Sequence, residues 1–343
     1  MVQNIYTEWK KTKWDDINVE ELQEQNKKLQ KEVKGCDKMV KNWPCYKGLE
    51  DSVKNMQSSL PLVEELRSKA MRDRHWKQVM KACGTNFQMD DTFTFGSMLE
   101  LELHRFEDDV LEIVDRATKE LGIEKQLVKL ADTWKVQNLT YPVDAENPDL
   151  CSLFVDETVM EALEDNSLLL QNLQSSKYVQ GNPDFLAKVQ DWQKKLGMVD
   201  VVLSTWKEVQ GKWGNLQSIF IGSADIRVQL PEDSKRFDGI DAQWKDLMKE
   251  AINETNAVLA CNFEGRLENI EGMLAGLEKC EKALADYLET KRLAYPRFYF
   301  VDGADLLDIL SKGSNPQLIL KHMPKCFDNI ETLEFNKDDA GVP

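Results

Sequence analysis

An all-α fold is predicted for this chain of 343 residues by three observations. Glycine and proline are sparse, at 17 and 10 residues, and most of them stand between segments of helical periodicity. Within those segments apolar residues recur every three or four positions, as on one face of a helix. The length suits one large domain or two to three smaller ones of roughly 150 residues each. We expect an elongated rod of consecutive helical bundles.

The N-terminal part is helical in its pattern and has balanced charge. Pro44 and Pro61 interrupt it, because proline lacks the amide hydrogen that a helix interior needs. We expect residues 1–70 to form a helical neck that precedes the main bundles.

A clearer helix start lies at Ser97, which has Glu100 three positions later, the spacing of a capping box. From there to Leu121, apolar residues recur in alternating steps of four and three, which places them on one helix face. Gly122 is expected to end this helix, and a second helix is expected to begin at Ile123.

Another strong start is Asn182 followed by Pro183, a capping residue before a proline at the first helical position. On the helix that follows, large apolar residues stand seven positions apart: Trp192, Val199, Trp206 and Trp213. Tryptophans at such spacing beside leucine and valine are core residues more often than a stacking platform. We expect residues 71–220 to form the first main bundles.

The remaining chain opens with a glycine-bearing break at residues 221–231. The longest helix of the chain is predicted over about residues 263–293, and the helix before it is predicted to carry Phe237, Ile240, Trp244, Leu247, Met248 and Ala251. The aromatic run at residues 296–301 is bounded by proline and by Asp302-Gly303, which predicts a small β-hairpin or a buried strand. Residues 221–335 are expected to form the central bundles, followed by a short end at 336–343.

Charge and cysteine content exclude several classes of protein. Asp and Glu number 60 against 44 Lys and Arg, a net charge of −16, so nucleic acid and anionic membrane surfaces are poor partners. An apolar run long enough to span a membrane and an N-terminal signal sequence are both absent. The seven cysteines are scattered without a C-x-x-C pair, as expected for reduced packing residues of an intracellular protein.

The sequence contains no recognisable catalytic, cofactor-binding or metal-binding motif. The nearest approach to a phosphate-binding loop is Gly211-Lys212, but Trp213 follows where Ser or Thr is needed and Trp206 replaces the first glycine. Neither a G-x-G-x-x-G nor a G-x-S-x-G motif occurs. The three histidines are isolated from one another and from further ligands at metal-site spacing.

One charge feature stands out. Between Lys135 and Lys177 there is no Lys or Arg, while eight acidic residues occur: Asp144, Glu146, Asp149, Asp156, Glu157, Glu161, Glu164 and Asp165. Such a run is usually a solvated surface. The alternative is an acidic docking patch, formed by Asp156, Glu157, Glu161 and Glu164, that meets a basic surface in a larger assembly.

Several runs of sequence point to one family. They are Trp206 to Trp213 (WKEVQGKW), Leu216 to Phe220 (LQSIF), Asp225 to Pro231 (DIRVQLP), Leu284 to Phe300 (LADYLETKRLAYPRFYF) and Asp305 to Leu310 (DLLDIL). With Arg74-His75-Trp76 upstream, these runs resemble the linker, or N-terminal region 2, of dynein heavy chains over residues 60–335.

Three further runs resemble the axonemal branch of that family. They are Tyr287 to Arg292 (YLETKR), Asp233 to Asp238 (DSKRFD) and Ser311 to Pro316 (SKGSNP). They look most like an outer-arm heavy chain of the beta type, which implies a place in the cytoplasm, in the cytoskeleton of the ciliary or flagellar axoneme.

The resemblance implies a mechanical role. In dyneins the linker is a rod of helical bundles that connects the tail to the AAA+ ring and swings with the ring's ATPase cycle to produce the power stroke. It implies ATP and Mg²⁺ in the ring, and intermediate chains, light chains and microtubules as partners of other parts of the full-length chain. The sequence stops after Asn336–Asp339, before the ring, so we expect a fragment that does not hydrolyse ATP by itself.

A lever needs long packed helices and a few places where the backbone bends. The candidate hinge residues are Gly222 and Pro231, at the break, and Gly272 and Gly276, inside a predicted helix. Each glycine inside a helix costs roughly 1 kcal/mol relative to alanine. Close packing of two helices is the alternative reason for the glycine pair.

Two other functions compete with the lever. A helical scaffold of spectrin or coiled-coil type would bind partner chains without swinging. An enzyme of unrecognised type would have a cleft with strongly perturbed ionisable groups. A phosphate-binding loop encoded within roughly the next 150 residues of the reading frame would favour the lever.

Overall fold

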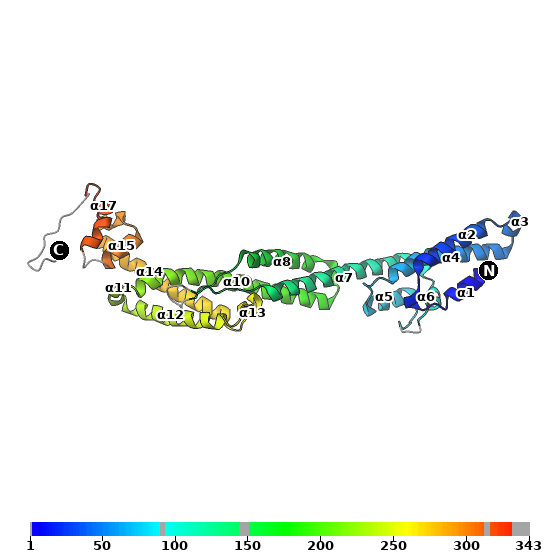
Figure 1. The fold of residues 1–343 in the computed structure, drawn as a ribbon, viewed down its shortest axis with the longest axis horizontal. Coiled ribbons are helices and arrows are strands. Elements are labelled where there is room, and N and C mark those ends of the chain that lie inside the picture. Colours follow the sequence, from blue (N-terminus) through cyan, green and yellow to red (C-terminus); the bar gives the residue numbers. More distant parts are fainter. Residues whose placement is uncertain (1, 90–92, 144–150, 312–315, 331–343) are drawn as a thin grey trace, which may run out of the picture. The chain divides into compact units, whose positions relative to one another are not determined.

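The structure, a computed structural model, describes residues 2–89, 93–143, 151–311 and 316–330 (Figure 1). The predicted all-α class is confirmed, because helices account for most of these residues. The described part contains no β-sheet, and its extended segments pair only through isolated bridges.

The chain forms two compact units, which are described separately. Unit 1 comprises residues 1–129 and 173–187, and unit 2 comprises residues 130–172 and 188–343. The predicted boundaries at residues 70, 220 and 335 remain predictions, and the short end at 336–343 lies outside the described residues.

Unit 1 is built on short helices around an antiparallel pair. Its elements are α1 (Val2–Trp9), η1 (Trp14–Asp16), α2 (Val19–Lys34), α3 (Lys38–Lys41), α4 (Pro44–Leu66), α5 (Asp73–Cys83), α6 (Phe95–Leu99), η2 (Leu103–Arg105), the start of α7 (Glu107–Val136) and α9 (Lys177–Gln180). Helices α2 and α4 lie side by side (Figure 1). Buried Asn26 of α2 joins them, because its amide nitrogen donates to the carbonyl of Val53, 3.3 Å away.

The predicted interruption at Pro61 is wrong. Pro44 begins α4, where a missing amide hydrogen costs nothing, but Pro61 lies inside this helix. An internal proline costs about 3 kcal/mol. The neighbouring Leu60, Leu62 and Val63 are at most 2% exposed, and their burial offsets that cost.

The predicted helix from Ser97 to Gly122 is also wrong in both its bounds. The cap is Thr94, whose hydroxyl accepts a hydrogen bond from the Ser97 amide at 3.3 Å, and helix α6 is only one turn long. Helix α7 then runs without a break through Gly122. A single glycine costs roughly 1 kcal/mol, too little to end a helix whose core face is packed on both sides of it.

Unit 2 contains most of the longest described helix, α10. Its elements are α8 (Glu157–Ser175), α10 (Pro183–Phe220), α11 (Ala224–Gln229), α12 (Pro231–Ala251), α13 (Ala257–Cys261), α14 (Arg266–Ala294), η3 (Pro296–Phe300), α15 (Gly303–Ser311), α16 (Pro316–Ile319), η4 (Leu320–His322) and α17 (Met323–Cys326). The predicted start at Asn182-Pro183 is confirmed, and the Asn182 side chain caps the Asp184 amide at 3.1 Å.

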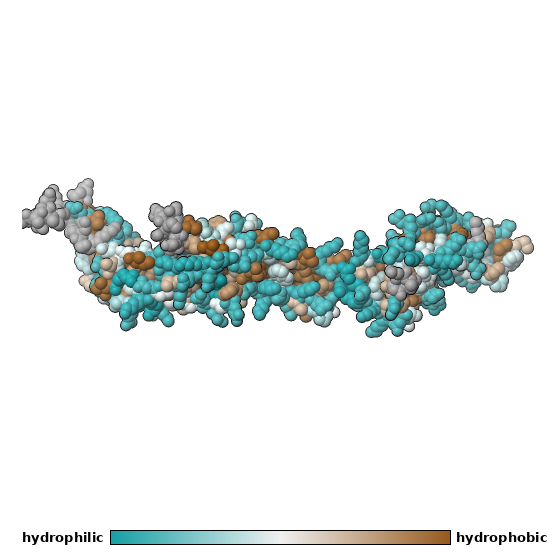
Figure 2. Space-filling model, turned by 60° about the horizontal axis from the view of Figure 1, so that its bottom comes forward, coloured by the Kyte–Doolittle hydropathy of each residue, from teal (hydrophilic) through white to brown (hydrophobic). Residues whose placement is uncertain are grey.

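The core of unit 2 lies along α10. Its face predicted from seven-residue spacing is buried at Val199, Trp206 and Trp213, and Trp213 stacks on Trp244 of α12 with ring centroids 5.4 Å apart. Six of the nine tryptophans of the chain are buried, which supports the core role predicted for them, while Trp43 is 57% exposed. Figure 2 shows hydrophilic side chains over most of one face, with apolar side chains in small groups between them.

Two predictions for the C-terminal part need correction. Helix α14 has 29 residues and α10 has 38, so the predicted longest helix is not the longest. The predicted hairpin at residues 296–301 is the 3₁₀ helix η3. Pro296 starts this helix, the Phe298 amide donates to the Tyr295 carbonyl, and no neighbouring strand is present in the described chain to pair with the aromatic run.

Candidate hinge and docking surfaces

The predicted acidic patch lies at the start of α8. Glu157, Glu161 and Glu164 are exposed and stand three or four positions apart, so they share one helix face. None of them has an ion-pair partner within the part of the chain that the structure describes. Leu168, 53% exposed, lies on the same face. Residues 144–150, which carry three more of the predicted acidic residues, lie outside the described ranges.

Asp156 has a different role from its three neighbours. Its carboxylate accepts hydrogen bonds from the Thr158 hydroxyl at 2.7 Å and from the Thr158 amide at 2.9 Å. These bonds lower the pKa of the Asp156 carboxyl below its ordinary value, because they favour the charged form. Asp156 therefore caps the first turn of α8 and keeps its negative charge beside the glutamates.

The predicted break between α10 and α12 is present. Helix α10 ends at Phe220, the six-residue helix α11 follows, and α12 begins with Pro231 at its first position. Gly222 stands in the turn after Phe220, where a Cβ atom would lie 2.3 Å from the Ser218 carbonyl oxygen. Only glycine fits this tight turn. Gly222 therefore determines where the break begins, and Pro231, at the first position of α12, determines where it ends.

Gly272 and Gly276 of α14 lie in two different environments. Helix α14 is continuous through both positions. A Cβ atom on Gly276 would lie 2.6 Å from the Cδ1 atom of Ile240 on α12, which is the close helix packing considered as the alternative to bending. A Cβ atom on Gly272 would meet no atom within 4 Å.

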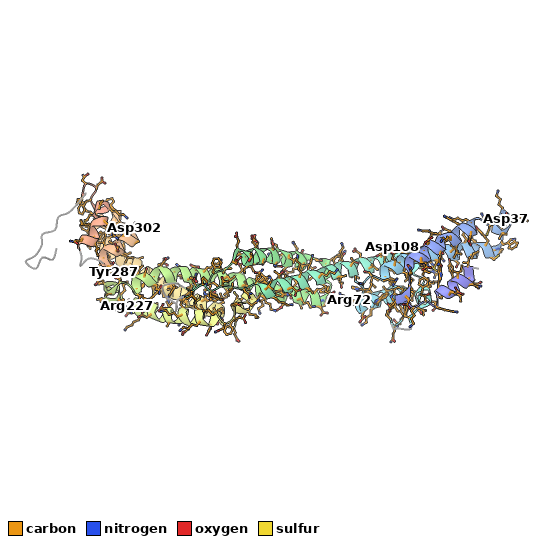
Figure 3. All side chains as sticks on the ribbon, in the orientation of Figure 1. Asp37, Arg72, Asp108, Arg227, Tyr287 and Asp302 are labelled. Atoms are coloured by element: carbon orange, nitrogen blue, oxygen red, sulfur yellow. The ribbon has the colours of Figure 1, made fainter. Side chains whose placement is uncertain are left out.

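An arginine that the sequence analysis did not single out joins the elements of the break. The Arg227 guanidinium of α11 lies 3.2 Å from the Phe220 carbonyl oxygen and 3.2 Å and 2.5 Å from the two carboxylate oxygens of Asp238. Figure 3 labels Arg227 beside α11 and α12. Its partner is eleven positions away on another helix, so helical spacing gives no signal for the pair.

A second feature missed from sequence is a short antiparallel ribbon. Thr140 pairs with Phe154 and Val143 with Cys151. The outer edge of the ribbon is covered by Gln210 of α10, whose side-chain oxygen lies 2.6 Å from the Leu153 amide and whose nitrogen lies 3.1 Å from the Leu153 carbonyl. The adjacent Phe154 and Val155, an aromatic and a β-branched residue of the kind enriched in strands, are the signal that was available.

One cluster of buried polar groups in unit 1 centres on His75. Its Nδ1 atom accepts from the Arg72 amide at 3.1 Å, and its Nε2 atom lies 3.1 Å from Glu120. These contacts fit a neutral ring that carries its proton on Nε2. Burial lowers the pKa of the His75 ring despite the nearby Glu120 carboxylate.

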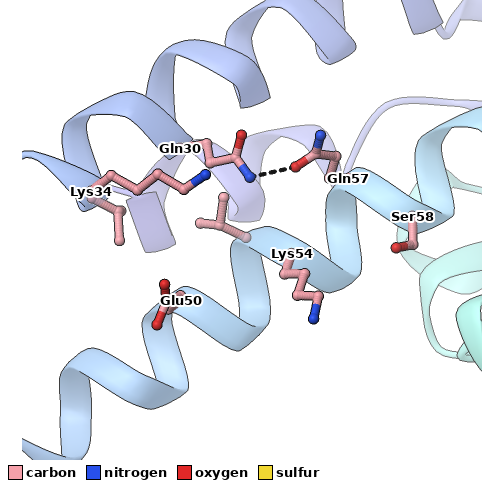
Figure 4. A pocket seen from close by; sticks show the side chains of 8 residues that line it. Gln30, Lys34, Glu50, Lys54, Gln57 and Ser58 are labelled. Atoms are coloured by element: carbon pink, nitrogen blue, oxygen red, sulfur yellow. Dashed lines mark hydrogen bonds between the residues drawn. The ribbon is translucent and has the colours of Figure 1, made fainter.

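The grooves of the structure offer little chemistry. The groove between α2 and α4, of about 510 Å³, is lined by long polar side chains, among which Gln30 donates to Gln57 at 2.6 Å (Figure 4). The described residues contain no cluster of three or more His, Cys, Asp or Glu side chains that could hold a metal ion. Burial raises the pKa of the Cys261 thiol to about 12, which keeps it protonated and unreactive at neutral pH.

Among the helices that the structure describes, none is both long and apolar enough to cross a bilayer.

Comparison with known proteins gives consistent matches. The family model described as dynein heavy chain, N-terminal region 2, matches residues 1–342. The flagellar outer-arm dynein beta chain of Chlamydomonas reinhardtii is 56% identical over 338 residues, which are 98% of this chain and 7% of that protein. Mouse dynein axonemal heavy chain 17 is 48% identical over 343 residues, 100% of this chain and 8% of that protein.

A ciliary relative agrees with these two. The ciliary dynein beta chain of the sea urchin Tripneustes gratilla is 48% identical over 341 residues, 99% of this chain and 8% of that protein. The chain thus spans less than a tenth of the length of these relatives. With a family model that covers almost every residue, the chain belongs to the dynein heavy chain family, as part of its N-terminal region 2.

Proposed function

We propose that this chain is the mechanical linker of an axonemal dynein motor, which swings with the ATPase cycle of an AAA+ ring and drives ciliary or flagellar beating. The observation that carries the proposal is the match to N-terminal region 2 over residues 1–342, together with 56% identity to a flagellar outer-arm beta chain. The similarity to outer-arm and ciliary chains supports a place in the axoneme.

The packing of unit 2 suits a part that transmits force. Helix α10 has 38 residues, roughly 57 Å at 1.5 Å per residue, and it packs against α12 through stacked aromatic rings. Phe220 and Phe237 are fully buried, and their ring centroids lie 5.4 Å apart. Stacked and buried rings of this kind make the pair of helices resist bending, because a close-packed interior has few voids into which the rings could move.

The proposed hinge lies at residues 221–231, between Gly222 and Pro231. Here one long helix ends and another begins, so the backbone can rotate without breaking helical hydrogen bonds. Gly272 and Gly276 are a second candidate. The contact of Gly276 with Ile240 favours packing at that position.

The proposed docking patch is the exposed face formed by Asp156, Glu157, Glu161 and Glu164. Carboxylates without ion-pair partners attract a basic surface of the ring through contacts that salt screens and that release easily. Turnover of ATP, binding of Mg²⁺ and contacts with microtubules and with intermediate and light chains are proposed to belong to other parts of the full-length heavy chain.

Energy transfer between two labels in a full-length motor tests the lever. One label is placed at Lys249, an exposed position at the end of α12, and the other in the first AAA+ module. We expect the transfer efficiency to differ between the ATP state and the post-hydrolysis state. An efficiency that stays constant through the cycle, with the ATPase active, would instead favour a static helical scaffold.

A further inference from the structure

The short helix α11 connects two long antiparallel helices of unit 2. Trp213 stacks on Trp244 and Phe220 stacks on Phe237, so the rings pair in reverse order along α10 and α12. The backbone reverses its direction between these two helices within ten residues, 221–230. The position of α11 therefore sets the geometry of this turn.

Helix α11 packs against α12 and α15, but few of its side chains anchor it. Ile226 is its buried apolar anchor, at 1% exposure, while Val228 is 75% exposed. Ser223, at the N-terminal end of α11, makes no capping hydrogen bond. The remaining anchor is the Arg227 guanidinium, which bonds to the last carbonyl of α10 and to Asp238 of α12. One side chain thus ties three helices together.

A groove of about 500 Å³ lies on one side of α11, between it and α15. Its lining includes Ser218 from the end of α10, Ser223 and Ile226 from the break, and Ala304 and Leu307 from α15. The Ser223 hydroxyl is buried and has no hydrogen-bond partner in the described part of the chain. A buried polar group without a partner costs free energy that a shift of α11 can recover. The groove provides the room for that shift.

We propose that α11 is the pivot of the 221–231 hinge and that Arg227 is the latch that holds it. With the latch closed, the bidentate bond to Asp238 fixes the angle at which α11 leaves α10. When the bond opens, α11 moves into the groove beside α15. Both partners of the latch are exposed by 40% or more, and such pairs are weak, so a modest change in load or in a neighbouring surface can open it.

This inference deepens the proposed lever function, but its test does not need a motor. Amide hydrogen exchange of the 343-residue chain reports local opening directly. In Arg227→Gln we expect exchange at residues 221–230 to rise by about two- to fivefold, the effect of losing a half-exposed ion pair. Arg227→Lys keeps the charge without the two-pronged geometry and should give a smaller rise. The exchange rates of amides in helix α14 should be unchanged in both variants.

The matched control is Arg236→Gln. Arg236 lies on α12, two positions before Asp238, and pairs with Asp233, three positions earlier on the same helix. Its removal changes the net charge by the same amount and leaves α11 untouched, so exchange at 221–230 should stay as in the unmodified chain. An equal rise in both variants, or a rise in Arg227→Gln that spreads evenly over α12 and α14, would overturn the latch.

The groove is tested by filling it. Ala304→Leu adds an apolar side chain on the exposed face of α15 that lines the groove. In the Arg227→Gln background it should return exchange at 221–230 toward the original rate, and an unchanged rate would contradict movement into the groove. These exchange results together with a constant energy-transfer efficiency in the full-length motor would support α11 as a pivot and contradict the proposed lever function.

Discussion

Gly276 of α14 and Ile240 of α12 are in such close contact that a Cβ atom added to the glycine would lie 2.6 Å from the Ile240 Cδ1 atom. The two helices share the core of unit 2 through Ile240 and Met273, at 6% and 1% exposure. The glycine therefore sets how closely α12 and α14 approach. Gly272, one turn earlier, has open space at the same atom.

These two glycines are expected to respond to alanine with opposite signs. Gly276→Ala gains roughly 1 kcal/mol in helix propensity but forces the buried Ile240 to shift at a cost of about 1–3 kcal/mol, so it should destabilise the chain by up to about 2 kcal/mol. Gly272→Ala should stabilise it by roughly 1 kcal/mol, because alanine restricts the unfolded chain and clashes with nothing. Urea unfolding of both variants measures the difference. Ile240→Val removes the clashing atom and should restore part of the lost stability in Gly276→Ala. A stabilised Gly276→Ala would contradict the packing role.

In the full-length motor the same pair separates bending from packing. If α14 bends at the glycines, Gly272→Ala together with Gly276→Ala should slow microtubule gliding more than basal ATP turnover. Gly272→Ala alone is the control without a packing defect, so a gliding defect shared by both variants would indicate bending. If the ratio of gliding speed to ATP turnover is unchanged in both variants, the glycine pair has a packing role only.

The ribbon edge covered by Gln210 gives a second stability prediction. Gln210→Ala leaves the Leu153 amide and carbonyl without their partners, and each buried group that loses its hydrogen bond costs about 1–3 kcal/mol. We expect a lower urea midpoint and faster amide exchange at Leu153. Gln210→Glu keeps the acceptor for the amide and should protect Leu153 better than alanine does. Equal exchange in the two variants would show that the side chain does not hold the edge.

Local sequence signals predicted the start of α10 but missed the bounds of several other helices. Pro183 begins α10 as predicted, because proline suits the first helical turn. Pro231 begins α12 for the same reason, although its predicted place is in the break before the helix that carries Phe237. Gly122 and Pro61 do not end their helices, because the burial of neighbouring side chains outweighs the local cost. Burial depends on the tertiary fold, which periodicity within one segment does not contain.

The candidate site was only partly predictable for a similar reason. The break at Gly222 and the exposed glutamates of α8 follow from glycine chemistry and from the absence of basic residues. The contact of Gln210 with Leu153 joins residues 57 positions apart, and that of Arg227 with Asp238 joins two different helices across a reversal of the chain. The aromatic run at 296–301 has strand propensity, but it forms a 3₁₀ helix instead. Strand propensity stabilises a strand only where a neighbouring strand is present to pair with it.

His75 makes unit 1 sensitive to acid. Burial lowers the pKa of its ring, so the folded state favours the neutral form. The stabilisation is present above the pKa of the unfolded chain, near 6.5, and is lost as the pH falls toward the lower folded value. A proton on Nδ1 would also face the Arg72 amide, which now donates to that atom. We expect the stability of unit 1 to fall between pH 7 and pH 5.

The measurement is amide exchange in α5 as a function of pH, corrected for intrinsic exchange rates. His75→Gln cannot gain a proton in this range, so the acid-dependent loss of protection should largely disappear. His104→Gln is the matched control in the same unit and should keep the slope of the original chain. A slope that survives in His75→Gln would assign the acid sensitivity to other groups.

The acidic face of α8 predicts a salt effect on the motor. Asp156→Asn with Glu157→Gln, Glu161→Gln and Glu164→Gln removes four charges, while the asparagine introduced at the cap still offers a side-chain oxygen to the Thr158 amide. If this face docks on a basic surface, coupling of ATP turnover to gliding should fall at low salt and converge with the original motor at high salt, where screening removes the attraction. The control is a second set of four exposed acidic residues replaced by Gln: Glu232, Glu264, Glu268 and Glu271. Both variants change the net charge equally, so a response confined to the α8 set would arise from its position, and identical responses would leave this face as solvated surface only.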